Sequence, residues 1–375
     1  MNGYVRTMPR ISKYERVPTA AKVIYVITAV TAVLHVIASV SEQFADFFNL
    51  HISSVLRASL AFITGFIPFS VAELLIIAFP VWIFLLLRHA MKHHCNSGKA
   101  FLAYLASLGS AVCVFYILFF WVYGVGYCAP ELDKKLSYDR EKVSVTELRE
   151  TAEILAEYTN EASKEVLFRE KDFSVMPYDV SGLADKLNDA YKSFTDKNSY
   201  VSKMKSELKP VMLSEAMSYT HLTGIYSYFT GESNINVVFP DYTIPYTAAH
   251  EMAHQRGIAR ENEANFVAFL VCTESDDPYI RYSGYVNMLE YVLNALYSAD
   301  KEQYYEVMQE VSLDVRYEMA SYSIFFDKYR DSTAGKVSSS VNDTYLKING
   351  NVGEKSYGMV VDLTVAYYKY LGKIS

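Results

Sequence analysis

Cysteine is scarce in this sequence, which has four in 375 residues. A disulfide framework needs many more cysteines in a chain of this length, so the class of disulfide-stabilised scaffolds is excluded. Only Cys128 and Cys272 lie beyond the long apolar runs and their connecting loops, where they could pair. Cys272 continues the apolar face of a helical pattern, and we expect it to pack in the core instead.

A basic excess is absent from the larger part of the sequence. Residues 1–128 carry nine basic and four acidic side chains, a balance of +5, so the total of −7 leaves −12 for residues 129–375. Nucleic acids are bound by basic surfaces that neutralise phosphates, and anionic lipids attract basic segments. We therefore expect neither nucleic acid nor tight electrostatic attachment to anionic lipid as a partner of residues 129–375.

Three long apolar runs account for the hydrophobic excess of the sequence. They are Val23–Val40, Val71–Leu87 and Phe101–Tyr127. At 1.5 Å per residue, each run is about long enough to cross a hydrocarbon core of roughly 30 Å. The first run is longer than the core of a signal peptide and lacks a clear small-residue cleavage site, so we expect it to be retained as a membrane helix.

A fourth apolar stretch, Ile52–Phe69, is interrupted by Arg57, Gly65 and Pro68. It is joined so closely to the next long run that it has no room to cross the membrane separately. We therefore expect an interfacial or re-entrant segment here, and three transmembrane helices in all.

Basic residues gather before the first long run and between the last two. Loops rich in Lys and Arg stay in the cytoplasm, so with three spans both groups lie inside the cell and everything after Tyr127 lies outside. The residues are Arg6, Arg10, Lys13, Arg16, Lys22, Arg88, Lys92 and Lys99. The sequence thus predicts a multi-pass cell-membrane protein in a lipid bilayer, with a membrane domain at residues 1–128 and an extracytoplasmic domain at residues 129–375.

Helical periodicity dominates residues 129–375, where we find no internal repeat, heptad run or low-complexity tract. Ser144 and Glu147 form a capping-box pattern at the start of the first helix. The other segments with a helical pattern are Leu183–Phe194, Tyr279–Ser298, Glu302–Tyr329 and Ser356–Leu371. Short strands are predicted at Ile225–Phe229 and Asn234–Phe239, and an exposed loop at Ser332–Asn342. The predicted fold is mainly α with a small β element.

Residues 250–254 read His-Glu-Met-Ala-His, which sets two imidazoles one helical turn apart with a carboxylate beside the first. Residues four apart share one face of a helix, so His250 and His254 can reach the same metal ion. This is the geometry of a catalytic zinc site, in which Glu251 points toward a water molecule held by the metal. The motif predicts Zn2+ as cofactor and hydrolysis as the reaction.

A third ligand has to come from nearby, because hydrolytic zinc sites usually take three protein ligands. Gly257 suits the left-handed residue that ends a helix, after which a second helix begins near Arg260 and can face the first. Glu261 lies on the face of this helix that meets the first, whereas Glu263 lies off it. We expect Glu261 to be the ligand, with Glu263 as the alternative. Asn265, one turn later, is placed to hydrogen-bond a ligating histidine.

These two helices resemble those of the gluzincin metallopeptidases, whose HExxH helix is followed by a helix with a ligand glutamate in a Glu-x-x-Ala-Asp or Glu-x-x-Ala-Asn setting. Glu261 and Asn265 match those positions, although aspartate is common at the second and only about six residues separate His254 from Glu261. Gly224–Phe269 and the hydrophobic N-terminus resemble more closely a family of uncharacterised bacterial membrane proteins with a zincin-type domain. The resemblance implies a zincin-like domain over residues 129–375.

The sequence therefore predicts a membrane-anchored, gluzincin-like zinc metallopeptidase that hydrolyses peptide or protein substrates with Glu251 as general base. Tyr357 or His221 could stabilise the oxyanion, although with 32 tyrosines any one is more typical of packing. A second hypothesis is a non-catalytic, zinc-stabilised extracytoplasmic receptor or assembly module, with an enclosed site and a fourth protein ligand. A third, a helical membrane protein without metal, requires the paired histidines to be coincidental.

Overall fold

The computed structural model describes residues 13–95, 97–138, 140, 142–169, 173–349 and 356–374, with the side chains of residues 13 and 356–358 excepted. The fold is mainly helical, as predicted, with a small sheet. In chain order the elements are the short 3-10 helix η1 (Lys13–Glu15), α1 (Thr19–Val40), α2 (Glu42–Phe47), the π-helical η2 (Phe48–Ser53), α3 (Ser54–Gly65), α4 (Val71–His93), α5 (Gly98–Val122), the 3-10 helix η3 (Gly124–Cys128), α6 (Leu132–Leu136), α7 (Val145–Ser163), α8 (Val180–Lys197), β1 (Leu208–Pro210), α9 (Ser214–Ser218), β2 (Gly224–Ser227), β3 (Glu232–Ile235), α10 (Thr243–Gln255), α11 (Glu261–Thr273), α12 (Pro278–Ala299), α13 (Lys301–Glu310), α14 (Leu313–Arg330), α15 (Thr333–Ile348) and α16 (Ser356–Tyr370).

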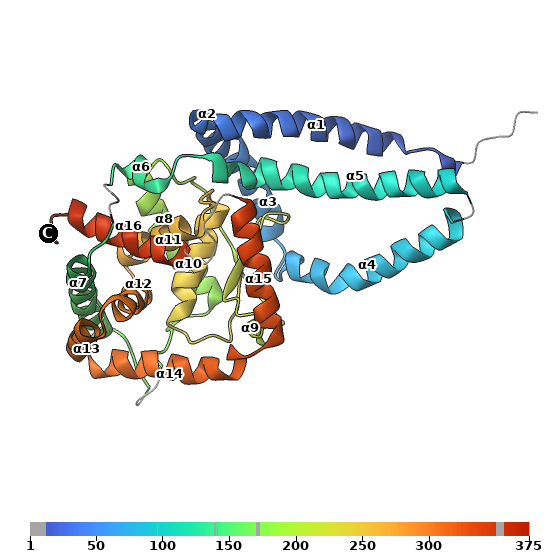
Figure 1. Ribbon diagram of the computed structural model, residues 1–375. Coiled ribbons are helices and arrows are strands. Elements are labelled where there is room, and N and C mark those ends of the chain that lie inside the picture. The colour runs from blue at the N-terminus through green and yellow to red at the C-terminus, as the bar shows by residue number, and fades with distance from the viewer. Residues whose placement is uncertain are drawn as a thin grey trace, which may run out of the picture.

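Three long helices project from one side of a rounded helical domain (Figure 1). Helices α1 and α5 run antiparallel and side by side, and α4 diverges from them at an angle. The segment from α2 to α3 stays at the domain end of this bundle and packs there on β3 and α5. The apolar surface of the projecting helices indicates that the protein associates with a membrane.

Four helical segments are long and apolar enough to cross a membrane, one more than the sequence predicted. The additional one is Glu42–Gly65, in which α2, η2 and α3 follow one another without a break. Arg57 does not interrupt it, because the buried guanidinium donates to Asn49 Oδ1 and to the Val122 carbonyl, both at 2.9 Å. The interruption that the sequence suggested at Arg57 is therefore absent, because a charged residue that is satisfied internally leaves a helix intact.

Local capping signals set the ends of several domain helices. The Ser144 side chain accepts from the Glu147 backbone N–H, and the Glu147 carboxylate accepts from the Ser144 N–H, which confirms the predicted capping box of α7. Asp277 caps α12 by accepting from the N–H groups of Tyr279 and Ile280. Proline at the first position of this helix costs no hydrogen bond, since that N–H has no partner within a helix.

The small β element is a three-stranded sheet in the order β1-β3-β2. Strand β3 is central and fully buried, with β1 parallel on one side and β2 antiparallel on the other. Tyr226 of β2 and Leu208 of β1 both lie opposite Ser233. Of the two predicted strands, one matches β2 closely and the other overlaps only the end of β3. Strand β1 was missed because its three residues are too few to show an alternating pattern.

Two predictions for the C-terminal part were wrong in detail. The segment Glu302–Tyr329 forms two helices, because Asn160 of α7 accepts from the Ser312 N–H and donates to the Glu310 carbonyl at the break between them. Ser332–Asn342 is the first part of α15, not a loop. The Ser332 hydroxyl caps it by accepting from the Gly335 N–H, and Val337 and Val341, four residues apart, line a cavity described below.

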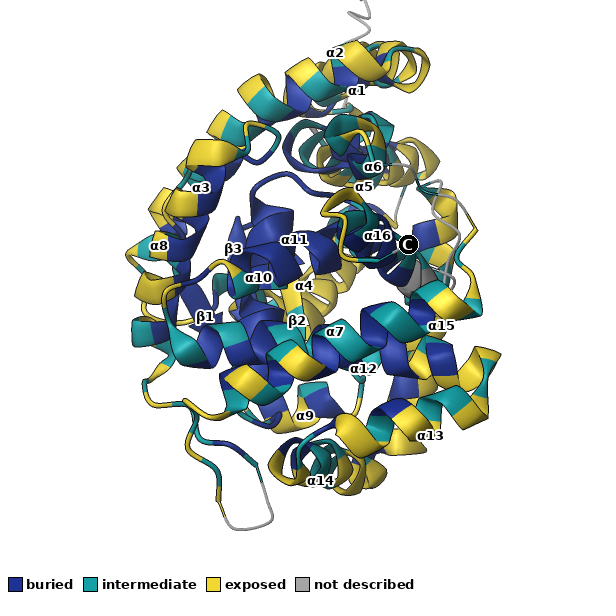
Figure 2. Ribbon diagram, turned by 90° about the vertical axis from the view of Figure 1, so that its left-hand side faces the viewer, coloured by how far each residue is buried: buried dark blue, intermediate teal, exposed yellow. Residues whose placement is uncertain are grey.

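Helices α10 and α11 form the centre of the domain, where Figure 2 shows them enclosed by the other elements. Every residue of Asn262–Cys272 is buried, and so is all of α10 except His250. Cys272 is therefore a core residue, as predicted, and all four cysteines are free. The core of the domain is thus built directly around the motif at residues 250–254.

Glu318 of α14 gives the stability of the domain a specific pH dependence. Its buried carboxyl accepts from the Ser174 N–H at 2.7 Å and from the Tyr282 hydroxyl, while burial raises its pKa to about 7 from 4.5. The folded state therefore holds this proton more tightly than the unfolded state. Its contribution to stability is complete below about pH 4.5 and is lost as the pH rises through about 7.

We predict that Glu318→Gln flattens the pH dependence of the free energy of unfolding. Relative to wild type, the variant should gain about 3 kcal/mol between pH 4.5 and pH 8, since each pKa unit is worth about 1.4 kcal/mol. Denaturant unfolding of the purified protein in detergent at several pH values measures this change. Glu157→Gln, at an exposed position of α7, is the control. Equal pH profiles for wild type and Glu318→Gln would contradict the assignment.

Candidate metal centre

His250 and His254 lie on one face of α10, with their ring centroids 4.5 Å apart. Helix α10 ends at Gln255, and Gly257, two residues further on, has a φ of +101° that only glycine adopts without strain. The Ile258 N–H returns to the Ala253 carbonyl at 3.1 Å, which satisfies an end group of the helix. The chain therefore reverses here and brings α11 alongside α10, as the sequence predicted.

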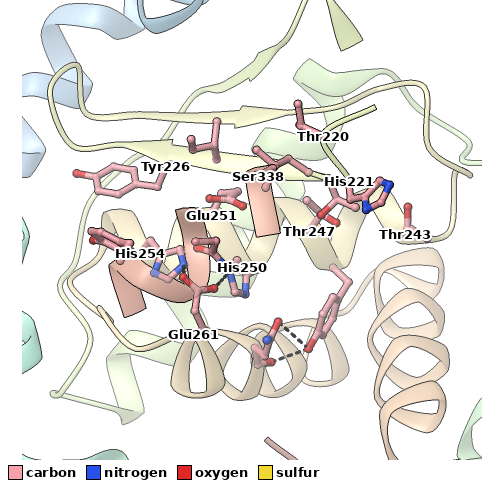
Figure 3. Close-up of a pocket in the computed structure, with 18 of the residues that line it drawn as sticks. Thr220, His221, Tyr226, Thr243, Thr247, His250, Glu251, His254, Glu261 and Ser338 are labelled. Carbon is pink, nitrogen blue, oxygen red and sulfur yellow. Dashed lines mark hydrogen bonds and ion pairs between the residues drawn. The ribbon is translucent and has the colours of Figure 1, made fainter. Parts of the chain in front are cut away.

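Glu261, the first residue of α11, closes a triangle with the two histidines (Figure 3). Its carboxylate oxygens lie 3.3 Å from His250 Nε2 and 3.5 Å from His254 Nε2. Two ligand atoms held about 2.1 Å from one tetrahedral zinc ion lie about 3.4 Å apart, so these distances fit such an ion. The three residues form the one group of this kind that could hold a metal ion within the described part of the chain.

The protonation of His254 is suited to metal binding. Its Nδ1 lies 2.7 Å from the Ile258 carbonyl, which can only accept, so Nδ1 carries a proton and Nε2 is the nitrogen that faces Glu261. The Tyr123 hydroxyl, 3.0 Å from the same Nδ1, donates to the Ala259 carbonyl. A hydrogen bond to the second ring nitrogen is the usual support of a ligating histidine. His250 Nδ1 is buried without a protein partner, so its ring is less firmly oriented.

Charges within this cluster stabilise one another. Burial raises the pKa of Glu261, but the two histidines outweigh it and hold the pKa well below its usual range. Burial lowers the pKa of His254, and Glu261 outweighs it and raises that pKa to about 9. The ion-free cluster is thus an ion pair, in which a divalent cation would replace a proton.

Glu251 points away from this triangle, toward β2 (Figure 3). A Cβ atom at Gly224 would come within 2.6 Å of Glu251 Oε1 and within 2.9 Å of Thr247, so glycine is required for the strand to approach. Burial raises the pKa of Glu251 although both histidines oppose the rise. The carboxyl therefore sits beside the metal-binding triangle with an increased affinity for a proton.

Two predicted roles turn out differently. Glu263, the alternative ligand, faces away, because its carboxylate accepts from the Leu132 N–H at 2.9 Å and pairs with Arg260 at 3.3 Å. Asn265 contacts neither histidine. The Tyr246 hydroxyl bonds instead to the carbonyl of Asn265 at 3.0 Å and reaches its side-chain oxygen at 3.5 Å. Because of the way α10 and α11 cross, the residue one turn after Glu261 on α11 meets Tyr246 of α10 and not a histidine. The periodicity of a single helix does not reveal how two helices cross.

A cavity of about 1000 Å3 opens beside the metal-binding triangle. Its floor is the face of α10 that carries Thr243, Thr247 and His250 (Figure 3). Strand β2 forms one wall, α12 another, and α15 covers it with Val337 and Val341. The space is large enough for a segment of peptide, and it reaches the candidate ligands directly.

Several residues that surround the site were not found from the sequence. Tyr123 follows the last apolar helix, and Tyr345 belongs to α15, yet both line the cavity. Tyr345 and Tyr127 are linked through their hydroxyls at 3.2 Å. His221, which was predicted as a candidate oxyanion donor, lines the cavity with Nε2 bonded to the Tyr329 carbonyl at 2.8 Å. The side chain of Tyr357, the other candidate, lies outside the described residues.

Comparison with known proteins gives a family but no activity. Over residues 48–365 the chain matches the family described as Protein of unknown function (DUF3810). This stretch includes α4, α5, the candidate metal centre and the cavity. Comparisons with curated proteins and with solved structures return no match. Since the match covers well over half of the sequence, the chain belongs to the DUF3810 family.

Proposed function

We propose that the protein is a membrane-anchored zinc metallopeptidase. The observation that carries the proposal is the convergence of His250, His254 and Glu261 within 4.8 Å of one another, with Glu251 and an open cavity beside them. Two imidazoles and one carboxylate are the donor set of hydrolytic zinc sites, and they leave one coordination position for water or substrate. When bound, zinc would supply Lewis acidity that polarises a carbonyl and lowers the pKa of a water molecule.

Glu251 is the proton carrier of this mechanism. It takes a proton from the attacking water and delivers it to the nitrogen of the leaving amine, so that one group acts first as base and then as acid. Its raised pKa suits both steps, because a carboxylate that binds protons weakly takes up a proton poorly and then has none to deliver to the amine. The close approach of Gly224 holds this carboxyl between β2 and α10, beside the ligand triangle.

Strand β2 is the element that would align a peptide. It is an edge strand, and Gly224, Ile225 and Tyr226 line the cavity. An unpaired strand edge offers backbone N–H and C=O groups to an extended chain, which can join the sheet as a further strand. A peptide bound in this way runs past Glu251, with its scissile carbonyl over the ligand triangle.

The arrangement of the membrane helices supports three crossings with the site outside the cell. Basic residues mark the ends of the projecting helices that lie away from the domain, namely Arg16, Lys22, Arg88, Lys92 and Lys99. Positively charged ends tend to stay in the cytoplasm, and we therefore infer that the domain lies on the other side. The segment from α2 to α3 packs against the domain and in this topology lies at the outer surface, although its length and composition would permit a crossing.

The competing hypothesis is a structural zinc site in a receptor or assembly module. Such a site needs a fourth protein ligand and an enclosed metal. Among the described residues the ligand group has three members, Glu263 is bound elsewhere, and the triangle borders a cavity. These observations favour the catalytic hypothesis.

Substitution of each candidate ligand in turn should show whether Glu261 or Glu263 binds zinc. Wild-type protein and Glu263→Gln are expected to hold about one zinc per chain, because Glu263 only bonds to a backbone N–H and to Arg260. His250→Ala and Glu261→Ala should lose most of it. Elemental analysis after dialysis measures the occupancy, and full zinc content in Glu261→Ala would overturn the ligand assignment.

The variant Glu251→Gln should keep its zinc and lose hydrolysis. The amide cannot take a proton from water, so kcat is expected to fall about 100-fold to 10,000-fold. Turnover of internally quenched peptides, measured together with zinc content, tests this expectation. Retention of wild-type kcat with full zinc would eliminate the proposed mechanism, whereas Glu157→Gln should leave both quantities unchanged.

The proposed sidedness can be tested through Cys95, which is exposed at the end of α4 away from the domain. With Cys113 and Cys128 replaced by serine, a membrane-impermeant maleimide should label Cys95 only after the membrane is permeabilised. A cysteine introduced at Glu157 in the domain should react in intact cells. The reverse pattern would place the domain in the cytoplasm.

A further inference from the structure

The cavity extends well beyond the metal centre along α10. Thr247 and Thr243, one and two turns before His250, line it, so it reaches about 10 Å from the ligands at 1.5 Å per residue. Helix α12 forms the wall at this remote end, where Asn287 donates to the Tyr242 carbonyl at 3.4 Å. The remote end is therefore a separate part of the cavity, with lining residues that do not contact the ligand triangle.

Glu290 is the acidic residue of this remote end. It lies on α12, one turn after Asn287 and one turn before Asn294, and all three side chains line the cavity. Among the described residues, the Tyr242 hydroxyl donates to its Oε1 at 3.1 Å. Burial and the charge of Glu318 raise its pKa to about 7, although the hydrogen bond from Tyr242 opposes the rise.

No basic side chain among the described residues that line the cavity neutralises this carboxylate. Among the described residues that line the cavity, none is lysine or arginine, while Glu251, Glu261 and Glu290 are acidic. Glu251 and Glu261 are engaged with the histidines, which leaves Glu290 as the acid whose counter-charge has to come from outside. A half-buried carboxylate in a cavity without a basic residue is stabilised most by a ligand that brings a cation.

We propose that Glu290 is a specificity-determining residue that binds a cationic group of the substrate, an ammonium or guanidinium, at the remote end of the cavity. This inference rests on the proposed peptidase function. An extended peptide advances about 3.3 Å per residue, so a span of about 10 Å places the cation about three residues from the scissile bond. The group is either a lysine or arginine side chain or the free amino terminus of a short peptide.

The experiment uses the full-length, zinc-loaded protein in detergent and two kinds of internally quenched peptide. In the first kind, one lysine is moved along an otherwise neutral, N-acetylated sequence, with norleucine at the same position as the matched control. In the second, the neutral sequence carries a free or an acetylated amino terminus. We expect kcat/KM to rise about tenfold or more for lysine at one position, or for one length of free terminus, and Glu290→Gln to abolish that preference.

Tyr242→Phe is the matched control, because it removes the hydrogen bond to Glu290 and keeps the charge. It should preserve the preference. A preference that survives in Glu290→Gln, or cleavage of all peptides without a preference for the cation, would overturn the role of Glu290 while leaving the peptidase proposal intact.

Binding to the Glu251→Gln variant keeps the two proposals distinguishable. Fluorescence anisotropy of labelled peptides should show that Glu251→Gln binds the lysine peptide about tenfold more tightly than the norleucine peptide. The double variant, which carries Glu290→Gln as well, should lose this difference. If no peptide is cleaved by the wild type, the peptidase proposal fails on its own, and the binding result still decides the role of Glu290. Equal binding of the two peptides would refute it.

Discussion

The structure depends on the burial of two imidazoles and a carboxylate between α10 and α11. Buried polar groups are costly unless they satisfy one another, and here Glu261 faces both Nε2 atoms while His254 Nδ1 donates to the Ile258 carbonyl. The rest of both helices is close-packed core, so the three side chains have little freedom to move apart. The position of the ligands is therefore fixed by the same packing that holds the domain together.

The membrane part is built onto this centre. Asn49 of η2 donates to the Gly257 carbonyl at 2.9 Å, in the turn that joins α10 to α11. The Arg57 guanidinium lies so close to this turn that a Cβ atom at Gly257 would come within 2.5 Å of it. At the start of α4, the Glu232 carboxylate accepts from the N–H groups of Val71 and Ala72. The domain is thus attached to its membrane helices by buried hydrogen bonds, and not only by a linker.

What could be predicted from the sequence was the information that lies within one helix or one turn. The spacing of His250 and His254, the turn at Gly257 and the choice of Glu261 over Glu263 all follow from helical periodicity, and the structure brings those residues together as expected. Asn265 shows the limit. Its position one turn after Glu261 was right, but its partner depends on how two helices cross, which periodicity does not encode.

The residues that the sequence did not reveal as part of the site were missed for the same reason. Tyr123, Tyr345 and Glu290 reach the cavity from helices that are distant in sequence, and each reads as an ordinary helical residue in its own segment. Ser332–Asn342 was taken for a loop because its residues are small and polar, yet it begins α15, which the Ser332 hydroxyl caps. A composition that is typical of loops can form a helix where a side chain satisfies the first backbone N–H groups.

The contact between Tyr123 and His254 also limits where a substrate can come from. Tyr123 directly follows α5, and its hydroxyl lies 3.0 Å from a nitrogen of the candidate ligand. Under the proposed topology α5 ends at the outer membrane surface, so the metal centre lies about one tyrosine side chain from that surface. Under the proposed function, a site in this position would meet peptide segments held near the bilayer before those free in solution.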